Sequence, residues 1–495
     1  MTDHLVHLVT TPIYYVNDRP HIGHAYTTIA CDAYARWLRK DPSNIALFST
    51  GTDEHGLKVQ QAAAARNIPP QDFVDEVSQH FIDILPKINA SPNNFIRTTE
   101  DRHKRAVHIL WKRLEQRDYI YLGVYSGWYA VKDEAYYAEN ETEIVNGVRK
   151  SVATGAEVQW FEEPCYFFRL KALQGKLLEF LEANPGFIQP KSRRNEVLSV
   201  VRAGLDDLCI SRRNVTWGIQ VPNDPDQTIY VWIDALTNYL TAAGYPAPWW
   251  EKLLVTHVVG KDILRFHAIY WPAILIAAGY QPPHKIVAHG WWTTRSTKIG
   301  KSSGNAVNIE ALIERYGVDA VRYFLLREIP FGDDGEFSEE AIVNRYNTEL
   351  ANNLGNLLNR ALNLVHRDFN GRIPNVTIED WRRSLVHQSI VNSEQEFSSL
   401  KFRDAIEHLN LLAGEANRIF TNEKSWSNDV LIDDRAHTLH YVLWTIVQIA
   451  NGLLPVIPVS AQKILDLCGA VDGQINYGTI LPERSVVFPR LEFSK

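Results

Sequence analysis

Apolar and polar residues follow a regular pattern over the first 56 positions. Residues 4–12 form an apolar run that ends at a proline, which predicts a buried strand. Apolar side chains then recur at steps of three and four, as on one face of a helix, at Ile22, Tyr26, Ile29, Ala33 and Trp37. A second apolar run at 45–50 precedes the polar segment 51–56. Strand, helix and strand in this order predict a parallel α/β sheet, whose ligands lie beyond the carboxyl ends of its strands.

The pattern changes twice further along the chain. Between about 118 and 227, aromatic and β-branched residues alternate with polar ones, which predicts an inserted β-rich unit. The α/β pattern resumes at 228–234 and again at 253–260. After about residue 344 the chain reads as successive amphipathic helices. We therefore predict an α/β domain split by an insertion, followed by a helical C-terminal domain.

Composition narrows the class of protein. With 495 residues, 45% hydrophobic and 22% charged, the chain is typical of a globular protein of two to four domains. The net charge of -7 argues against a protein that coats nucleic acid non-specifically, so contacts with nucleic acid would need local basic patches. No apolar run is long enough for a membrane helix, and the N-terminus lacks the features of a signal peptide. We expect a cytoplasmic protein without membrane contact.

The four cysteines are far apart and include no C-x-x-C pair: Cys31, Cys165, Cys209 and Cys468. This spacing argues against a zinc finger and against a disulfide framework. We expect the cysteines to be isolated thiols in a reducing compartment.

Two histidines mark the predicted start of the first helix. His21 and His24 are three residues apart and so face the same side, with Gly23 between them to let a ligand approach the backbone. A helix N-terminus suits phosphate, and the imidazoles could donate further hydrogen bonds to it. Two alternatives stay open at this point: a metal site made of His21, His24 and His55, or two solvent-facing histidines.

A second basic cluster occupies 298–305. Lys298 and Lys301 stand three apart in a loop of small residues, which would make a mobile cationic clamp for a polyphosphate. The segment lacks the spacing of a P-loop. Most lysine pairs are solvated surface charge, so this signal depends on its combination with His21 and His24.

The combined motifs resemble a known family. Residues 20–24 and 298–302 are similar to the HIGH and KMSKS signatures of class I aminoacyl-tRNA synthetases. Segments 11–17, 51–56, 230–235 and 260–263, with Phe266-His267, narrow the resemblance to the methionyl-tRNA synthetases. It implies a Rossmann-type catalytic domain in two halves, 1–117 and 228–290, separated by a connective insertion at 118–227. It also implies a stem-contact segment with a KMSKS-like loop at 291–344 and a helical anticodon-binding domain at 345–495.

The resemblance implies a two-step ligase reaction used in protein synthesis. Methionine attacks the α-phosphate of ATP, which acts with Mg²⁺, and pyrophosphate leaves; methionine then passes from the adenylate to tRNA(Met). His21, His24, Lys298 and Lys301 would be the catalytic groups. The ATP site would comprise these four with Gly23, Asp262 and Ser302.

The same resemblance assigns the other substrate contacts. Asp53 would accept the α-amino group of methionine, and Arg212 would support the active site. The methionine pocket would be lined by Ile13, Tyr15, Trp232, Ala235, Leu236, Tyr239, Ile263 and His267. A soft thioether suits aromatic and aliphatic walls. Asn356 and Arg360 match the anticodon-contacting positions, whereas a third, aromatic contact has no clear match and Tyr477 is only a guess.

The sequence departs from the family pattern at two places. The stretch 127–137 contains no cysteine where many relatives bind zinc, so we expect no zinc. Ile299-Gly300 replaces the usual Met-Ser, and Met1 is the only methionine of the chain. Redesign for methionine scarcity and ordinary compositional drift both fit this count.

Two other functions remain as alternatives. One is a class I synthetase for a different amino acid, and the other is an inactive paralogue that only binds tRNA. The retained His21, His24, Lys298 and Lys301 argue against the inactive paralogue. We expect a monomer, because no dimerisation domain is evident before Lys495.

Overall fold

The computed structural model describes residues 4–16, 19–133, 135–137, 139–213, 215–246, 249–294, 297–299, 307–475, 477 and 480–493. The chain forms two compact units. Unit 1 comprises Met1–Pro20, Ser43–Leu85 and Ser91–Ala288, and unit 2 comprises His21–Pro42, Pro86–Ala90 and His289–Lys495. The segment that carries His21 and His24 therefore belongs to the same unit as the helical C-terminal part.

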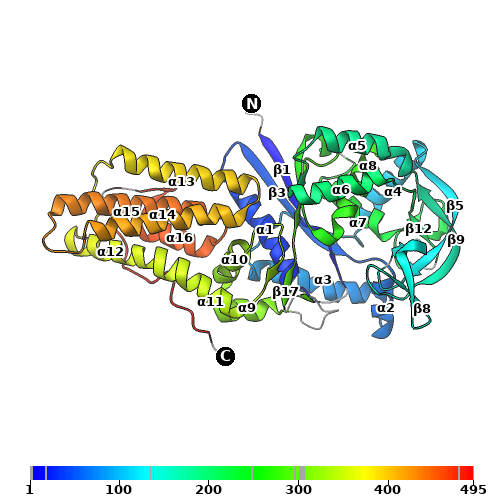
Figure 1. Ribbon diagram of the computed structural model, residues 1–495, viewed down its shortest axis with the longest axis horizontal. Coiled ribbons are helices and arrows are strands. Elements are labelled where there is room, and N and C mark those ends of the chain that lie inside the picture. Colours follow the sequence, from blue (N-terminus) through cyan, green and yellow to red (C-terminus); the bar gives the residue numbers. More distant parts are fainter. Residues whose placement is uncertain are drawn as a thin grey trace. The chain divides into compact units, whose positions relative to one another are not determined.

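Unit 1 contains a seven-stranded sheet, and two of its strands, β1 and β3, are labelled in Figure 1. Strand β1 (Leu5–Thr10) pairs in parallel with β3 (Asn44–Asp53) and with β15 (Leu253–Gly260), so that Val9 lies between Phe48 and Thr256. The strand order is β10 (Ile188–Gln189), β16 (Lys285–His289), β15, β1, β3 and β2 (Tyr14–Tyr15), and β4 (Asn94–Arg97) also pairs with β3. The predicted strands at 4–12, 45–50 and 253–260 and the α/β fold class are confirmed.

Helices pack with this sheet around apolar cores. They are α2 (Leu57–Ala65), α3 (Pro70–Lys87), α4 (Asp101–Gln116), α5 (Gln174–Ala183), α6 (Lys191–Ala203), α7 (Val231–Ala242) and α8 (Trp271–Ala278), with short helices η2 (Lys171–Leu173), η3 (Trp250–Lys252), η4 (Lys261–Ile263) and η5 (Phe266–Tyr270). Helices α2 and α3 share a smaller core with β2, and α4 to α8 belong to a larger one. Trp111 on α4, Leu240 on α7 and Trp271 on α8 are fully buried in the larger core. Helix α7 begins directly after β14, so residues 231–234 are helical.

The predicted β-rich insertion contains antiparallel sheets. A four-stranded sheet has the order β11 (Leu208–Cys209), β9 (Gln159–Phe168), β5 (Ile120–Ala130) and β6 (Ala135–Tyr137). The remaining elements are η1 (Glu139–Glu141), the hairpin β7 (Thr142–Val145) and β8 (Val148–Ser151), and the sheet of β12 (Ser211–Arg212), β14 (Asp224–Ile229) and β13 (Gln220–Val221). Strand β10, also within 118–227, joins the large parallel sheet instead.

The expectation that Cys165 and Cys209 are isolated is wrong. The two residues form a disulfide across a sequence separation of 44. Strands β9 and β11 pair in antiparallel register, with Cys209 opposite Phe167, and this pairing brings the two thiols together. Cys31 and Cys468 are buried free thiols.

Unit 2 consists mostly of helices. They are α1 (Ile22–Leu38), α9 (Ile309–Tyr316), α10 (Val318–Arg327), α11 (Glu339–Arg345), the π-helix η7 (Tyr346–Gly355), α12 (Asn356–Asp368), α13 (Asp380–Ser398), α14 (Phe402–Asn422), α15 (Ile432–Leu453) and α16 (Pro458–Leu467). Its short strands are β17 (Trp292–Thr294), β18 (Thr297–Lys298), β19 (Gly335–Glu336), β20 (Ala470–Val471) and β21 (Gln474–Ile475). Helices α12 to α16 form a bundle (Figure 1). No helix in the described part of the chain is long and apolar enough to cross a membrane.

A buried arginine links α1 to other parts of unit 2 through hydrogen bonds. The guanidinium of Arg322 on α10 is fully buried and donates to the Asp32 carboxylate on α1 at 2.8 Å. It also donates to the Val456 carbonyl oxygen between α15 and α16, at 2.8 Å, and to two carbonyl oxygens of the 86–90 segment, at 3.0 Å each. Arg36, on α1 itself, donates to the same Asp32 carboxylate at 2.7 Å. The helix that begins at His21 thus has a fixed place within this unit.

Candidate active site

The carboxyl ends of the parallel strands in unit 1 carry the expected methionine contacts. Tyr15 on β2 lies directly opposite Asp53 at the end of β3, because these strands pair in parallel. The Tyr15 hydroxyl donates to the His55 carbonyl oxygen at 3.2 Å, which holds the ring beside the strand end. Asp53 is buried, and Ile13 and Tyr15 are partly buried. A carboxylate in this position can pair with an ammonium group of a ligand.

Aromatic side chains from α7 and η5 form one wall in the same unit. The Tyr239 hydroxyl lies 2.6 Å from His267 Nε2, and the Trp232 ring is perpendicular to the His267 ring at a centroid distance of 6.5 Å. Trp232 also stacks on Phe266 with ring centroids 3.6 Å apart. Among the other expected wall residues, Ala235 and Leu236 are buried on α7, whereas Ile263 is partly buried. The structure therefore brings the predicted residues of α7 and η5 into one cluster.

The imidazoles of this cluster are uncharged at neutral pH. Burial lowers the pKa of His267 to about 4. Its Nδ1 lies 2.9 Å from the Ile263 carbonyl oxygen, so Nδ1 carries the proton and Nε2 accepts from Tyr239. Burial also lowers the pKa of His257, whose ring lies 4.0 Å from that of Tyr239. A neutral, aromatic wall is compatible with an apolar thioether side chain.

A buried carboxylate that the sequence analysis missed anchors the start of α7. Asp234 lies 2.6 Å from His55 Nδ1 and 2.7 Å from His103 Nε2, and all three are buried. Burial opposes ionisation of Asp234, but the two imidazoles outweigh it and lower the pKa to about 2. This contact fixes α7, and with it Trp232, relative to the end of β3. The three residues are 179 and 131 positions apart in sequence, so no local motif could reveal them.

His55 Nδ1 is thus already hydrogen-bonded to Asp234, which argues against His55 as a metal ligand. No group of three or more His, Cys, Asp or Glu side chains in the described ranges is placed to hold a metal ion. Arg212 lies in the small pocket lined by His55 and Trp217. It stacks on the Tyr230 ring at 4.5 Å and donates to Cys209 Sγ at 2.9 Å.

In unit 2, His21 and His24 cap the first turn of α1. The Gly23 amide donates to His21 Nδ1 at 3.0 Å, and the His21 amide donates to His24 Nδ1 at 3.1 Å. Both Nδ1 atoms are therefore acceptors, which leaves each neutral ring with its proton on Nε2. The rings stack with centroids 3.9 Å apart. A Cβ on residue 23 would lie 2.9 Å from the His21 ring, so Gly23 makes room for this cap.

The electrostatics of this helix start favour a neutral donor. Burial lowers the pKa of His24 well below its usual value, and the neighbouring His21 and Lys298 side chains lower it further. His24 can therefore present an Nε2–H to an anion without carrying a charge. Lys298 on β18 is exposed, with its Nζ 4.5 Å from the Trp291 ring centroid. Anion binding is the chemistry that this end of α1 and Lys298 best support.

The remaining expected ATP contacts are less defined. Asp262 is exposed on η4 of unit 1, directly after β15. Lys301, Ser302 and Gly300 lie outside the described residues. Ile299, which replaces the usual methionine, is 3% exposed and donates its amide to the Trp292 carbonyl oxygen at 2.9 Å. An aliphatic side chain of similar size fills this buried position, so the Ile299 substitution conserves packing.

The predicted anticodon-binding residues lie near the junction of η7 and α12. Asn356 is exposed, and the Arg360 guanidinium lies 4.5 Å from the Phe420 ring and 5.0 Å from the Trp426 ring. Trp426 is 44% exposed, so it adds a large aromatic face to this surface. Tyr477, in contrast, is hydrogen-bonded to His440 Nε2 at 2.7 Å. Trp426 was not predicted from the sequence. The one local indication of its role is that it stands alone as a large aromatic residue in the polar segment 423–429.

Comparison with known proteins assigns the family. A family model described as tRNA synthetases class I (M) matches residues 7–148 and 141–362. The methionine–tRNA ligase of Mycobacterium tuberculosis H37Rv is 47% identical, over 98% of this chain and 98% of its own length. The chain belongs to the class I methionyl-tRNA synthetase family. The methionine–tRNA ligase of Rickettsia bellii is also similar, with 45% identity over 98% of this chain and 99% of its own length.

Solved structures of methionyl-tRNA synthetase agree with this fold. The M. tuberculosis enzyme in complex with methionyl-adenylate has a TM-score of 0.93 and 45% identity, covering 98% of this chain and all of that chain. Its apo form has a TM-score of 0.86 and 42% identity, covering 99% of each. The family resemblance of the sequence motifs and the predicted α/β class with a helical C-terminal part are therefore confirmed. As a methionyl-tRNA synthetase family member, the chain is a ligase of the aminoacyl-tRNA synthetase type.

Proposed function

We propose that this protein activates methionine with ATP and Mg²⁺ and transfers it to tRNA(Met), releasing AMP and pyrophosphate. The main support for methionine as the amino acid is the neutral wall formed by Trp232, Tyr239 and His267. The same unit contains Asp53, at the end of β3. That wall suits a thioether, and the Asp53 carboxylate suits an α-amino group. We also propose a cytoplasmic monomer that needs no zinc, since 127–137 contains no cysteine.

The charged and polar groups of unit 2 have a complementary role in this proposal. His24 and His21 donate Nε2–H groups to ATP, and Lys298 with Lys301 stabilises the departing pyrophosphate. Catalysis then consists mainly of positioning and charge stabilisation, because the amino acid carboxylate is itself the nucleophile. Asp262 accepts hydrogen bonds from the adenosine ribose, and Arg212 supports the site beside Tyr230.

Pyrophosphate exchange measured with each amino acid tests the proposed function. Exchange with methionine alone supports it. Exchange driven by a different amino acid would show another specificity, and no exchange with any amino acid would indicate an inactive tRNA-binding paralogue. Charging of tRNA(Met) under the same conditions tests the second step.

Trp232→Ala should weaken methionine binding on the order of 10- to 100-fold, because it removes an aromatic wall of an apolar pocket. Discrimination against smaller amino acids should fall as well. Isothermal titration with methionine measures the change, and the exposed Trp249→Ala is the control. Unchanged methionine affinity would place Trp232 in the core rather than in the pocket.

Arg360→Ala should impair aminoacylation through weaker tRNA recognition while ATP–pyrophosphate exchange stays normal. Arginine can stack on exposed bases and donate directional hydrogen bonds to them, and Phe420 and Trp426 hold this guanidinium at the surface. Steady-state KM values for tRNA(Met) measure the effect.

Arg367→Ala is the matched control for this prediction. Arg367 lies on the same helix, but its guanidinium is paired with Asp368 at 2.6 Å. Equal losses in both half-reactions of Arg360→Ala would indicate a folding defect. Unchanged tRNA kinetics would mean that this polar face is simply solvated.

A further inference from the structure

The helix before Asn356 has an unusual hydrogen-bonding register. The sequence predicts an ordinary amphipathic α-helix at 349–361, and its apolar side chains are indeed buried: Leu350, Leu354, Leu357, Leu358 and Ala361. Residues Tyr346–Gly355, however, form the π-helix η7, and the Asn356 amide reaches back to the Ala351 carbonyl oxygen. Long π-helices are rare and are often associated with functional sites. The contacts that maintain this register therefore determine how the next turn, with Asn356 and Arg360, is presented.

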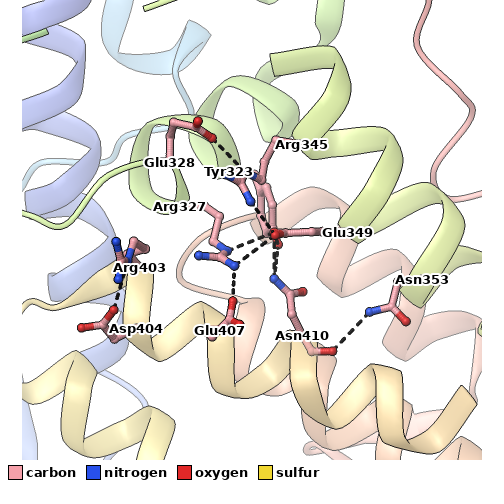
Figure 2. A network of polar contacts seen from close by, with 10 residues as sticks. All are labelled: Tyr323, Arg327, Glu328, Arg345, Glu349, Asn353, Arg403, Asp404, Glu407 and Asn410. Carbon is pink, nitrogen blue, oxygen red and sulfur yellow. Dashed lines mark hydrogen bonds and ion pairs between the residues drawn. The ribbon is translucent and has the colours of Figure 1, made fainter. Parts of the chain in front are cut away.

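One carboxylate holds the centre of η7 against its neighbours. Glu349 accepts hydrogen bonds from the Tyr323 hydroxyl at 2.7 Å, from Arg327 Nε and Nη2 at 3.0 Å each, from Arg345 Nη1 at 2.8 Å and from Asn410 Nδ2 at 2.8 Å (Figure 2). Its side chain is only 13% exposed. Burial opposes ionisation, but these donors outweigh it, so the pKa of Glu349 is lowered.

Helix α14 also holds η7 through Asn353, one turn after Glu349. Asn353 Nδ2 donates to the Asn410 carbonyl oxygen at 3.2 Å (Figure 2), and Asn417 Nδ2 donates to Asn353 Oδ1 at 2.8 Å. Phe420, one turn further along α14, contacts the Arg360 guanidinium. Glu349, Asn353 and Arg360 are thus held by successive positions of a single helix.

The other side of η7 is fixed by the C-terminal segment. Asn347 exchanges two hydrogen bonds with the Leu491 main chain, at 2.9 and 3.0 Å. A Cβ on residue 355 would lie 3.0 Å from the Leu350 carbonyl oxygen and 3.1 Å from the Phe488 ring, so Gly355 permits this close packing. The π-helix is therefore held on both sides, with Glu349 as its most extensively bonded residue.

We propose that Glu349 is a positioning residue for tRNA recognition: it holds η7 in the π register and so places Asn356 and Arg360 for contact with the RNA. This inference rests on the proposed role of those two residues. A return of η7 to the α register would rotate every following residue about the helix axis, because a π turn contains more residues than an α turn. Asn356 and Arg360 would then turn together away from their present direction, and Arg360 would lose its place beside Phe420 and Trp426.

Glu349→Gln tests the proposal with minimal change in shape. We expect the KM for tRNA(Met) to rise about tenfold, as for the loss of charge-assisted hydrogen bonds, with pyrophosphate exchange within about twofold of the parent. Glu339→Gln is the matched control, because Glu339 also accepts from an arginine and a tyrosine, Arg315 at 2.6 Å and Tyr316 at 2.7 Å. The control should leave both half-reactions unchanged.

A double-mutant cycle separates positioning from general stability. In an Asn356→Ala/Arg360→Ala background, Glu349→Gln should change the KM for tRNA by less than about twofold, because the groups to be positioned are already absent. Equal fold-changes in both backgrounds would overturn the proposal. If Glu349→Gln fails to fold, Asn417→Ala removes a different attachment of η7, and the same pattern is expected from it.

Hydrogen exchange gives a readout that does not depend on tRNA. The amides of 351–356 should exchange at least about tenfold faster in Glu349→Gln than in the parent, and unchanged exchange would overturn the proposal. A raised tRNA KM in Arg360→Ala but not in Glu349→Gln would overturn this inference alone. Unchanged KM values in both variants would overturn the anticodon assignment, and the inference with it.

Discussion

Arg322→Leu is expected to lower the free energy of unfolding by about 3–5 kcal/mol, because it removes one partner of a buried ion pair. Neither Arg322 nor Asp32 exposes any of its side chain, and the guanidinium also satisfies main-chain carbonyl oxygens from two separate segments. Arg36 would still contact Asp32, but it does not reach the Val456 carbonyl oxygen. Urea denaturation followed by circular dichroism measures the change.

An exposed ion pair provides the control for this effect. Arg66 is bonded to Glu76 through both of its terminal nitrogens, yet both side chains are about half exposed. Arg66→Leu should therefore cost much less stability than Arg322→Leu. The double variant Arg322→Leu with Asp32→Leu should recover part of the stability, since neither charge of this buried pair then remains. A loss below 1 kcal/mol for Arg322→Leu would show that water or other groups replace the guanidinium.

The central strands could be predicted because buried strands have short, nearly continuous apolar sequences. The carboxyl-terminal halves of β1 and β3 and most of β15 are buried on both faces, and these strands lie in short runs rich in apolar residues. The two-residue strands β2 and β10 carry no such signal, since their pairing depends on neighbours far away in sequence. The run at 229–233 is equally compatible with strand and helix, and α7 begins there at Val231.

The same limit explains what the sequence analysis missed in the sites. His21, His24, Asp53, Trp232 and Arg360 stand within local motifs, so their resemblance to the family is visible in the sequence. The side chains that orient these residues come from distant segments. Asp234, which fixes the helix of Trp232, is hydrogen-bonded to His55 and His103, and Arg360 contacts Trp426. The buried face of η7 follows from its apolar spacing, whereas its π register depends on α14 and the C-terminal segment.

Lys301→Ala should slow adenylate formation on the order of 10²–10³-fold, the loss typical of removing one preorganised donor from a developing anion. Lys301 lies outside the described residues, so the prediction rests on its position three residues after Lys298 in the KMSKS-like loop. Its charge is needed mainly as pyrophosphate develops, so methionine affinity should stay nearly unchanged. Rapid-quench measurement of a single turnover isolates this step from product release.

Two further variants make the assignment of Lys301 specific. Lys401→Ala removes an exposed lysine that is paired with Glu396 at 2.9 Å, and it should have no effect on activation. Lys301→Arg keeps the positive charge but changes its shape, so it should recover only part of the rate. Single-turnover activation within twofold of the parent for Lys301→Ala would mean that Lys298 alone provides the charge that pyrophosphate departure requires.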